Sequence, residues 1–291
     1  MPQFPKWIVD EVRVRKAGLR GGAAAGTAAE LAARELHTVC DEARCPNKGK
    51  CFSEGEATFL ILGDICTRKC GFCAVKKDKP RPPDPGEPRR VAELCLKWRL
   101  KYVVFTSPTR DDLPDGGAAY FAQTNRLIKQ LSPGIRTEPL IPDFQGSEAA
   151  LKTVLDSEPD VLGHNLEMVA GLYAGARAGA DYQRSLDLLA ASKRLRPDIL
   201  TKSGLMLGLG EKPEELEKAL ADLAAHGCDL LTLGQYLAPS GGHRPVVKYY
   251  TPEEFSFWGA RAKALGLRAV LSGPLVRSSY RAAALYRDAG N

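Results

Sequence analysis

The sequence contains no uninterrupted apolar run of the roughly 18–20 residues that a membrane-spanning helix requires. Its start also lacks an apolar stretch followed by a small-residue cleavage site, which is the pattern of a secretory signal. The same stretch carries Asp10 and Glu11, whereas transit peptides are poor in acidic residues. These absences predict a cytoplasmic protein that does not insert into a membrane.

The chain also lacks a Ser-His-Asp order and a zinc-type His-Glu motif, so it does not resemble the common hydrolases. Its positive excess is small and spread along the chain, with 41 Lys and Arg against 35 Asp and Glu. Such an excess does not indicate nucleic-acid binding. Hydrophobic residues form 44% of the 291 residues, which is enough to bury the core of one α/β barrel.

From residue 57 onwards, short apolar segments alternate with amphipathic segments of helix length. Such alternation implies parallel strands joined by helices. Six units are fewer than the eight of a complete barrel. We therefore expect a partial (β/α)6 TIM-type barrel with N- and C-terminal extensions; a doubly wound open sheet is the alternative. The predicted strands are 58–62, 102–106, 136–141, 161–165, 204–207 and 230–235, and the glycine–alanine stretch 21–26 is expected to be a loop.

Six of the eight cysteines fall within a 34-residue window, residues 40–73. Disulfide scaffolds are typical of short secreted chains, whereas clustered cysteines in a cytoplasmic protein indicate metal binding or catalysis. The other two, Cys95 and Cys228, lie in helix-like stretches. We expect them to be small buried apolar residues.

Cys66, Cys70 and Cys73 directly follow the first predicted strand, with three and then two residues between them. α/β barrels place their chemistry at this end of their strands. A structural zinc site needs four protein ligands, whereas three close thiolates suit a cubic iron–sulfur cluster with one iron left open. The triplet therefore predicts a 4Fe-4S cluster; a zinc or redox motif is the alternative.

Cys40, Cys45 and Cys51 form a second triplet in the N-terminal extension, with four and then five residues between them. Proline, asparagine and glycine within this segment oppose a continuous helix, so the segment can wrap around a cluster. We favour a second cluster with one ligand that is not cysteine. A zinc site completed by His37 is the alternative.

The first triplet resembles the signature of the radical S-adenosylmethionine (radical SAM) enzymes, with Phe72 as the aromatic residue before the last cysteine. The two triplets together resemble the lipoyl synthase family. Further stretches similar to that family cover nearly the whole chain: RPPDPGEP, RDDLPDGGA, LIPDFQG, HNLE, TKSGLMLGLGE, TLGQYLAPS and GPLVRSSY. The stretches 106–112 and 172–182 depart from the family pattern, but they include no predicted cluster ligand.

The resemblance implies site residues beyond the six cysteines. In the family, the fourth protein ligand of the auxiliary cluster is the second serine of an Arg-Ser-Ser-Tyr motif, which falls on Ser279 here. Without the resemblance, this motif would be interpreted as a helix N-cap. The residues expected near S-adenosylmethionine are Gly204, Gly208 and Glu211, in a glycine-rich motif, and Asn165 and Glu167, which otherwise form a strand-end turn.

Arg110, Asp111 and Asp112 form a charged run after the second predicted strand. Their composition alone predicts an ion network on the surface. The resemblance places them instead at the active-site end of the barrel.

The resemblance implies a sulfurtransferase of lipoate biosynthesis. Such an enzyme inserts two sulfur atoms, at carbons 6 and 8 of an octanoyl chain that is amide-linked to a lysine of a carrier domain. Two 4Fe-4S clusters and S-adenosylmethionine are the expected cofactors. The cluster of the first triplet would generate a radical, and the cluster of the second triplet and Ser279 would supply sulfur.

The expected partners are octanoylated carrier domains, of 2-oxoacid dehydrogenase acyltransferase subunits or the glycine cleavage H protein. An electron donor such as ferredoxin or flavodoxin and a cluster-repair carrier are also expected, and nucleic acid is not. We expect residues 1–56 to carry the auxiliary cysteines, 57–250 to form the barrel and 251–291 to form the C-terminal extension of one compact domain. Alternatives are another auxiliary-cluster radical enzyme, a paralogue without turnover, and a zinc or nucleic-acid-binding module.

Overall fold

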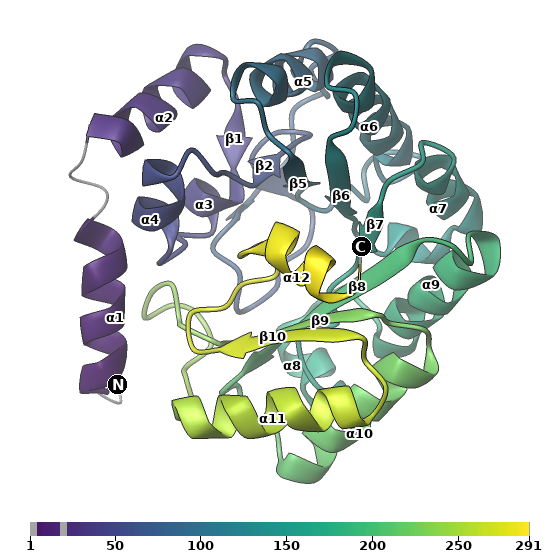
Figure 1. Ribbon diagram of the computed structural model, residues 1–291. Helices are drawn as coiled ribbons and strands as arrows, with labels where there is room; N and C mark the ends of the chain where they lie inside the picture. Colours follow the sequence, from purple (N-terminus) through teal and green to yellow (C-terminus); the bar gives the residue numbers. More distant parts are fainter. Residues whose placement is uncertain (1–4, 18–21, 291) are drawn as a thin grey trace.

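A computed structural model describes residues 5–17 and 22–290 of the chain (Figure 1). Its strands form one large sheet and a separate two-stranded ribbon. The strands are β1 (His37–Thr38), β2 (Phe59–Leu60), β3 (Ile65–Cys66), β4 (Lys76–Lys77), β5 (Tyr102–Thr106), β6 (Arg136–Leu140), β7 (Val161–Gly163), β8 (Leu200–Leu207), β9 (Leu230–Gln235) and β10 (Ala269–Gly273).

Most of the helices lie on the outer side of the large sheet, whereas the last one lies across the middle of the ring of strands (Figure 1). They are α1 (Lys6–Ala17), α2 (Gly22–Ala33), α3 (Val39–Glu42), α4 (Lys48–Ser53), α5 (Glu87–Lys97), α6 (Ala118–Leu131), α7 (Glu148–Leu155), α8 (Tyr173–Ala176), α9 (Tyr182–Leu195), α10 (Pro213–Ala225), α11 (Pro252–Ala264) and α12 (Ala282–Asp288), with short 3-10 turns η2 (Phe144–Gly146) and η3 (Ala170–Leu172). None of the described helices is long and apolar enough to cross a bilayer.

The large sheet has the strand order β1-β2-β5-β6-β7-β8-β9-β10. Within the described residues, all neighbouring strands are parallel except β1, which runs antiparallel to β2. Each of the six predicted strands overlaps an observed strand of the large sheet, so the partial barrel is confirmed. β10, which lies in the expected C-terminal extension, adds a further parallel strand beside β9.

Burial explains which strands the sequence pattern could locate. β9 coincides with 230–235 and is buried along its whole length, as expected for a parallel strand covered on both faces. β8 begins four residues before the predicted strand and includes Lys202. The ammonium of Lys202 donates to Glu138 of β6 at 2.7 Å, and both side chains are 2% exposed. A charged residue in the barrel core thus broke the apolar pattern, because a buried charge is tolerated only when paired.

Two further expectations have different outcomes. Cys95 and Cys228 are 0% and 4% exposed, which confirms that they are buried in the core. The loop expected at 21–26 is wrong for residues 22–26, which belong to α2, while residue 21 lies outside the described residues. Alanine is the strongest helix former, and here it outweighs the two glycines. Ala24 and Leu31 of this helix pack into the core.

Side-chain caps set where several of the helices begin. Ser147 accepts from the backbone of Ala150 at the start of α7, and Asp181 caps α9 in the same way. Thr251 and Glu254 form a reciprocal capping box at the start of α11. These caps satisfy backbone N–H groups that have no partner within the helix.

The segment after β10 runs along the open edge of the barrel. Its first part lies beside the N-terminal cysteine segment, where Leu275 accepts a hydrogen bond from Asn47. Its last part is α12, which lies across the middle of the ring of strands in Figure 1. Leu285 and Ala289 there pack against the amino ends of the strands, at Val161, Leu200, Leu230 and Ala269. The C-terminal segment therefore contacts both ends of the barrel.

Candidate active site

A cavity of about 1110 Å³ lies at the carboxyl ends of the barrel strands. Its walls come from the N-terminal cysteine segment, the strand ends and the segment after β10. The lining residues from these three regions include Cys40 and Cys45, Cys73 and Thr106, and Ser278 and Ser279. Segments from opposite ends of the chain therefore meet around one space.

The first cysteine triplet begins at Cys66, the last residue of β3, and continues in the loop that follows this strand. Burial raises the pKa of Cys73 to about 11, and the nearby thiols of Cys70 and Cys66 contribute. Burial likewise raises the pKa of Cys70, with Cys66 adding to the effect and Arg177 opposing it. The three sulfurs are therefore neighbours whose ionised forms need a cation beside them. An iron–sulfur cluster bound by thiolates supplies such positive charge, so these residues fit it.

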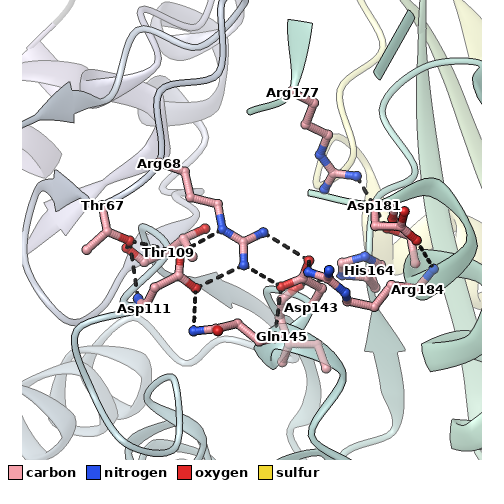
Figure 2. A network of polar contacts seen from close by, with 12 residues as sticks. Thr67, Arg68, Thr109, Asp111, Asp143, Gln145, His164, Arg177, Asp181 and Arg184 are labelled. Carbon is pink, nitrogen blue, oxygen red and sulfur yellow. Dashed lines mark hydrogen bonds and ion pairs between the residues drawn. The ribbon is translucent and has the colours of Figure 1, made fainter. Parts of the chain in front are cut away.

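Arg68, between Cys66 and Cys70, fastens their loop to two strand ends (Figure 2). Its guanidinium donates to both carboxylate oxygens of Asp111, at 2.8 and 2.9 Å, and to both of Asp143, at 2.9 and 2.7 Å. The side chains of Arg68 and Asp143 are 8% and 1% exposed. Paired bidentate contacts are strong and geometrically specific. They fix the backbone between two predicted cluster ligands.

Further side chains reinforce Asp143 and Asp111 (Figure 2). Arg184 of α9 donates to Asp143 at 3.2 Å, and the Gln145 amide donates to Asp111 at 3.3 Å. Burial opposes the ionisation of Asp143, but the hydrogen bonds from Arg68 outweigh it and hold the pKa at about 2. The loop is thus anchored by Asp143, whose carboxylate stays charged at neutral pH.

The surface ion network expected around Arg110 is wrong for that residue, which is 1% exposed. Arg110 donates to Asp112 at 2.8 Å and to the carbonyl oxygens of Leu62 and Arg81, at 3.1 and 3.0 Å. It therefore ties the β2 loop to the segment after the first triplet. Asp111 belongs instead to the network around Arg68.

The second triplet lies on two short helices, with Cys40 in α3, Cys51 in α4 and Cys45 between them. Burial raises the pKa of Cys40 and of Cys51 to about 12, and the neighbouring thiols of the triplet contribute. These thiols therefore also fit a cationic group. His37, the candidate zinc ligand, lies 3.7 Å from Glu42.

Neither triplet has the geometry of a site for one metal ion. Among residues 5–17 and 22–290, no three His, Cys, Asp or Glu side chains converge closely enough to hold a single ion. A tetrahedral zinc site requires that convergence. A cubic cluster binds each thiolate through a different iron, so its ligands stand farther apart.

The Arg-Ser-Ser-Tyr segment is fastened beside the second triplet by hydrogen bonds. Thr58 donates to the hydroxyl oxygen of Ser279 at 2.7 Å. The side-chain amide of Asn47, which is 1% exposed, donates to the carbonyl oxygen of Leu275 at 2.8 Å. Its own carbonyl oxygen accepts from Arg15 of α1 at 2.7 Å. Both ends of the chain are therefore joined at the second triplet.

Three of the residues expected near S-adenosylmethionine line the cavity, namely Asn165, Glu167 and Gly204. The Asn165 amide donates to the Glu167 carboxylate at 3.1 Å. A Cβ atom on Gly204 would lie 2.8 Å from the Thr232 hydroxyl and 3.0 Å from the Asn165 amide oxygen. Glycine at this position thus leaves these polar groups free to face the cavity.

Gly208 and Glu211 are not among the residues that line the cavity. The carboxylate of Glu211 accepts from the backbone N–H groups of Gly208 and Leu209, at 2.6 and 2.9 Å. Gly208 has a φ of 104°, which glycine adopts far more readily than other residues. These two residues shape the turn after β8. Of the five residues expected near S-adenosylmethionine, three therefore line the cavity and two do not.

Sequence reasoning did not single out four residues that organise this site. They are Asn47, Thr58, Arg68 and Asp143. The position of Arg68 inside the cysteine motif was a signal that could have been used. The partners of the others are far away in the sequence, as with the 221 positions between Thr58 and Ser279.

Comparison with protein families gives a match to the radical SAM superfamily over residues 60–223. This region contains the first triplet and the strands from β3 to β8. The second triplet and the Arg-Ser-Ser-Tyr motif lie outside it.

Curated relatives named lipoyl synthase match most of the chain. The protein of Geobacter sp. (strain M21) is 56% identical over 247 residues, which cover 85% of this chain and 84% of the relative. That of Trichlorobacter lovleyi is 53% identical over 281 residues, 96% of this chain and 97% of the relative. That of Thermus thermophilus is 54% identical over 256 residues, 87% of this chain and 79% of the relative.

Solved structures with a similar fold have low sequence identity to this chain. Methylornithine synthase has a TM-score of 0.56 at 14% identity, covering 72% of this chain and 62% of that one. The FeFe-hydrogenase maturase HydG from Carboxydothermus hydrogenoformans also gives 0.56 at 14% identity, covering 79% of this chain and 65% of that one. At such identities, these structures support the barrel fold alone.

Proposed function

Because this chain belongs to the lipoyl synthase family of the radical SAM superfamily, we propose that it inserts two sulfur atoms into a protein-bound octanoyl chain. The acceptor carbons would be 6 and 8 of octanoyl-lysine on a carrier domain, and the product would be lipoyl-lysine. Family membership implies S-adenosylmethionine and an iron–sulfur cluster. We further propose that there are two 4Fe-4S clusters.

We assign Cys66, Cys70 and Cys73 as ligands of the first cluster. When bound with S-adenosylmethionine, this group supplies a radical that removes hydrogen from an unactivated carbon, which no general base could deprotonate at working pH. The protein's part is to position that group. Arg68 holds the loop between the ligands, and its buried partner Asp143 stays ionised at neutral pH.

We assign five residues to S-adenosylmethionine in two roles. Asn165, Glu167 and Gly204 face the cavity and suit hydrogen bonds to a charged, hydroxylated ligand. Gly208 and Glu211 would act indirectly, by fixing the turn after β8 against which such a ligand rests.

We assign Cys40, Cys45, Cys51 and Ser279 as ligands of a second cluster that is consumed as the sulfur substrate. An alkoxide oxygen is a harder ligand than a thiolate. The Thr58 hydroxyl donates to the Ser279 oxygen and would stabilise it when ionised. Ser279 is thus suited to hold an iron that must later leave.

The single observation that carries this proposal is the shared cavity. It is lined by Cys73 of the first triplet, by Cys40 and Cys45 of the second, and by Ser279. Apolar residues such as Leu60 and Val276 also line it, as an alkyl chain requires.

The proposed partners follow from this chemistry. The substrates would be octanoylated domains of 2-oxoacid dehydrogenase acyltransferase subunits or the glycine cleavage H protein. A ferredoxin or flavodoxin would supply electrons, and a carrier would rebuild the spent cluster. We place this reaction in the cytoplasm, with auxiliary cysteines on 1–56, the barrel on 57–250 and the Ser279 segment on 251–291.

Anaerobic reconstitution tests the proposal. The protein should bind about eight irons and eight sulfides per chain if two cubic clusters form. With S-adenosylmethionine, a strong reductant and octanoylated H protein, mass spectrometry should show two sulfur atoms added to the carrier. Zinc without labile sulfide, or a carrier of unchanged mass, would contradict it.

A further inference from the structure

Five exposed cations lie within the short chain segment 69–81, which includes part of the first cysteine loop and the strand β4 that pairs with β3. We call this set the basic ribbon, and it consists of Lys69, Lys76, Lys77, Lys79 and Arg81. Asp78 is the one acidic residue within the stretch 76–81. Elsewhere, many exposed cations pair with a carboxylate on the same helix or a neighbouring one, as Lys152 does with Asp156. Within the described residues, no ion pair within 4.0 Å involves a member of the basic ribbon.

The basic ribbon is joined directly to the backbone of the predicted cluster ligands. β4 pairs in parallel with β3, so that Lys77 lies opposite Cys66. The ammonium of Lys77 donates to the carbonyl oxygen of Cys70 at 2.9 Å. A molecule that binds to the basic ribbon would therefore be separated from the cysteine loop only by the backbone of β4.

The basic ribbon also lies apart from the space that the substrate would fill. None of its five residues lines the cavity, whereas Cys73 does. Cations that do line the cavity are Arg13 and Arg44, beside the N-terminal segments, and Arg277. The cysteine loop thus has one side toward the cavity and another toward the basic ribbon.

We propose that the basic ribbon is the docking surface for an acidic electron-carrier protein. This inference rests on the proposed function, because it assumes a redox cluster at the first triplet. One electron leaves the reduced carrier, which is oxidised by one unit, and enters the cluster site, which is reduced by one unit. No bond is made or broken in this step.

The physical properties of the surface match those of transient redox contacts. Electron-transfer encounters use small interfaces and must dissociate after each turnover. Unpaired exposed charges give little affinity, but they steer an oppositely charged partner and raise its association rate. Docking here would also leave the cavity open to the acyl carrier domain during reduction.

The double variant Lys76→Glu/Lys79→Glu tests this surface without altering Lys77, which contacts the cysteine loop. With reduced flavodoxin as electron donor, we expect the rate of S-adenosylmethionine cleavage to fall about tenfold or more at low ionic strength. The loss should shrink as salt is added, since surface charges are screened. With dithionite, a small reductant that needs no docking surface, the rate should not change.

Binding provides a readout that does not depend on turnover. Oxidised, labelled flavodoxin should bind the unaltered holoenzyme, and its dissociation constant should rise at least tenfold for the double variant. The control Lys101→Glu/Lys263→Glu changes the net charge equally at exposed positions that form no ion pair within 4.0 Å in the described structure. It should leave both binding and the flavodoxin-driven rate unchanged.

Three outcomes would overturn the docking proposal. These are unchanged flavodoxin kinetics in the double variant, an equal loss in the control, and a loss with dithionite that tracks weaker binding of the octanoylated carrier. The last outcome would assign the ribbon to the acyl carrier instead. Failure of the unaltered protein to cleave S-adenosylmethionine with dithionite would contradict the proposed function. The dissociation constants of flavodoxin would still show whether the basic ribbon binds it.

Discussion

The two cysteine segments are held in the fold by different kinds of contact. The first is anchored by charge, because Arg68 forms bidentate ion pairs with Asp111 and Asp143. The second is joined to its partners by hydrogen bonds rather than ion pairs: Asn47 donates to Leu275 and accepts from Arg15, and Thr58 donates to Ser279. The first set of partners belongs to the barrel, whereas the second includes a segment near the end of the chain.

This difference matches the roles that we assign to the segments. A cofactor that is reused in every cycle benefits from a rigid setting, and buried ion pairs fix geometry when their partners are well placed. A cluster that is consumed must be replaced. Although Cys40 and Phe52 pack into the core, the second segment is joined to the Ser279 segment by hydrogen bonds, which can part without separating a buried ion pair.

Removal of the Ser279 hydroxyl should have the largest effect on product. Ser279→Ala should keep nearly the normal iron content and S-adenosylmethionine cleavage, yet form no detectable lipoyl product, because the releasable oxygen ligand is lost. Ser279→Cys should hold the cluster and also fail. Ser278→Ala, one residue away in the same motif, should retain activity. Normal lipoyl formation by Ser279→Ala in the mass-spectrometric assay would contradict the assignment.

Loss of the Arg68 anchor should have the largest effect on stability. Arg68→Met leaves Asp143 buried without its main partner, which typically costs about 3–5 kcal/mol. Urea unfolding of the apoprotein measures that cost, and iron analysis should show loss of about half of the metal. Arg196→Met, which removes an exposed pair with Asp198, should cost less than about 1 kcal/mol. Equal effects of the two substitutions would remove the distinction between the segments.

Asn47→Ala should affect the second segment more mildly. It leaves the carbonyl of Leu275 without its donor, at a cost of about 1–3 kcal/mol. Iron at the second triplet should fall, while S-adenosylmethionine cleavage persists. Asn125→Ala is the matched control, since this buried amide donates to Ser157 at 2.7 Å, away from both triplets. Iron loss in the control as well would indicate general instability rather than a specific effect of the hydrogen bond between Asn47 and Leu275.

Acid should weaken the ion pair between Asp143 and Arg68, and with it the stability of the protein, over a defined pH interval. The pKa of Asp143 is lowered to about 2 in the folded protein, from about 3.9 in an unfolded chain. Its stabilisation is therefore complete above pH 4 and is lost as the pH falls to about 2. The unfolding free energy of the unaltered apoprotein should fall by about 2 kcal/mol more over this interval than that of Asp143→Asn. If the unfolding free energies of the two proteins changed in parallel with pH, the Asp143–Arg68 ion pair would not be the anchor of the cysteine loop.

Sequence patterns predicted those parts of the fold that depend on residues close together in the chain. The strands β5 and β9 coincide with apolar runs, and both cysteine triplets were recognised from their spacing. The start of β8 was missed because Lys202 interrupts the apolar run and is stabilised by Glu138, 64 positions away.

The anchors of the two triplets could not be predicted for the same reason. Asp143 binds Arg68 across 75 positions, and Leu275 binds Asn47 across 228. Such pairs depend on how the barrel brings distant loops together. The cavity that joins both triplets follows from that arrangement and not from either motif.

The separation of roles between the triplets is the central claim, and two triple variants test it in one experiment. Replacing Cys40, Cys45 and Cys51 with alanine should leave about half of the iron, retain S-adenosylmethionine cleavage and abolish sulfur insertion. Replacing Cys66, Cys70 and Cys73 should also leave about half of the iron but abolish cleavage itself. Lipoyl product from the first variant, or full cleavage by the second, would contradict the account.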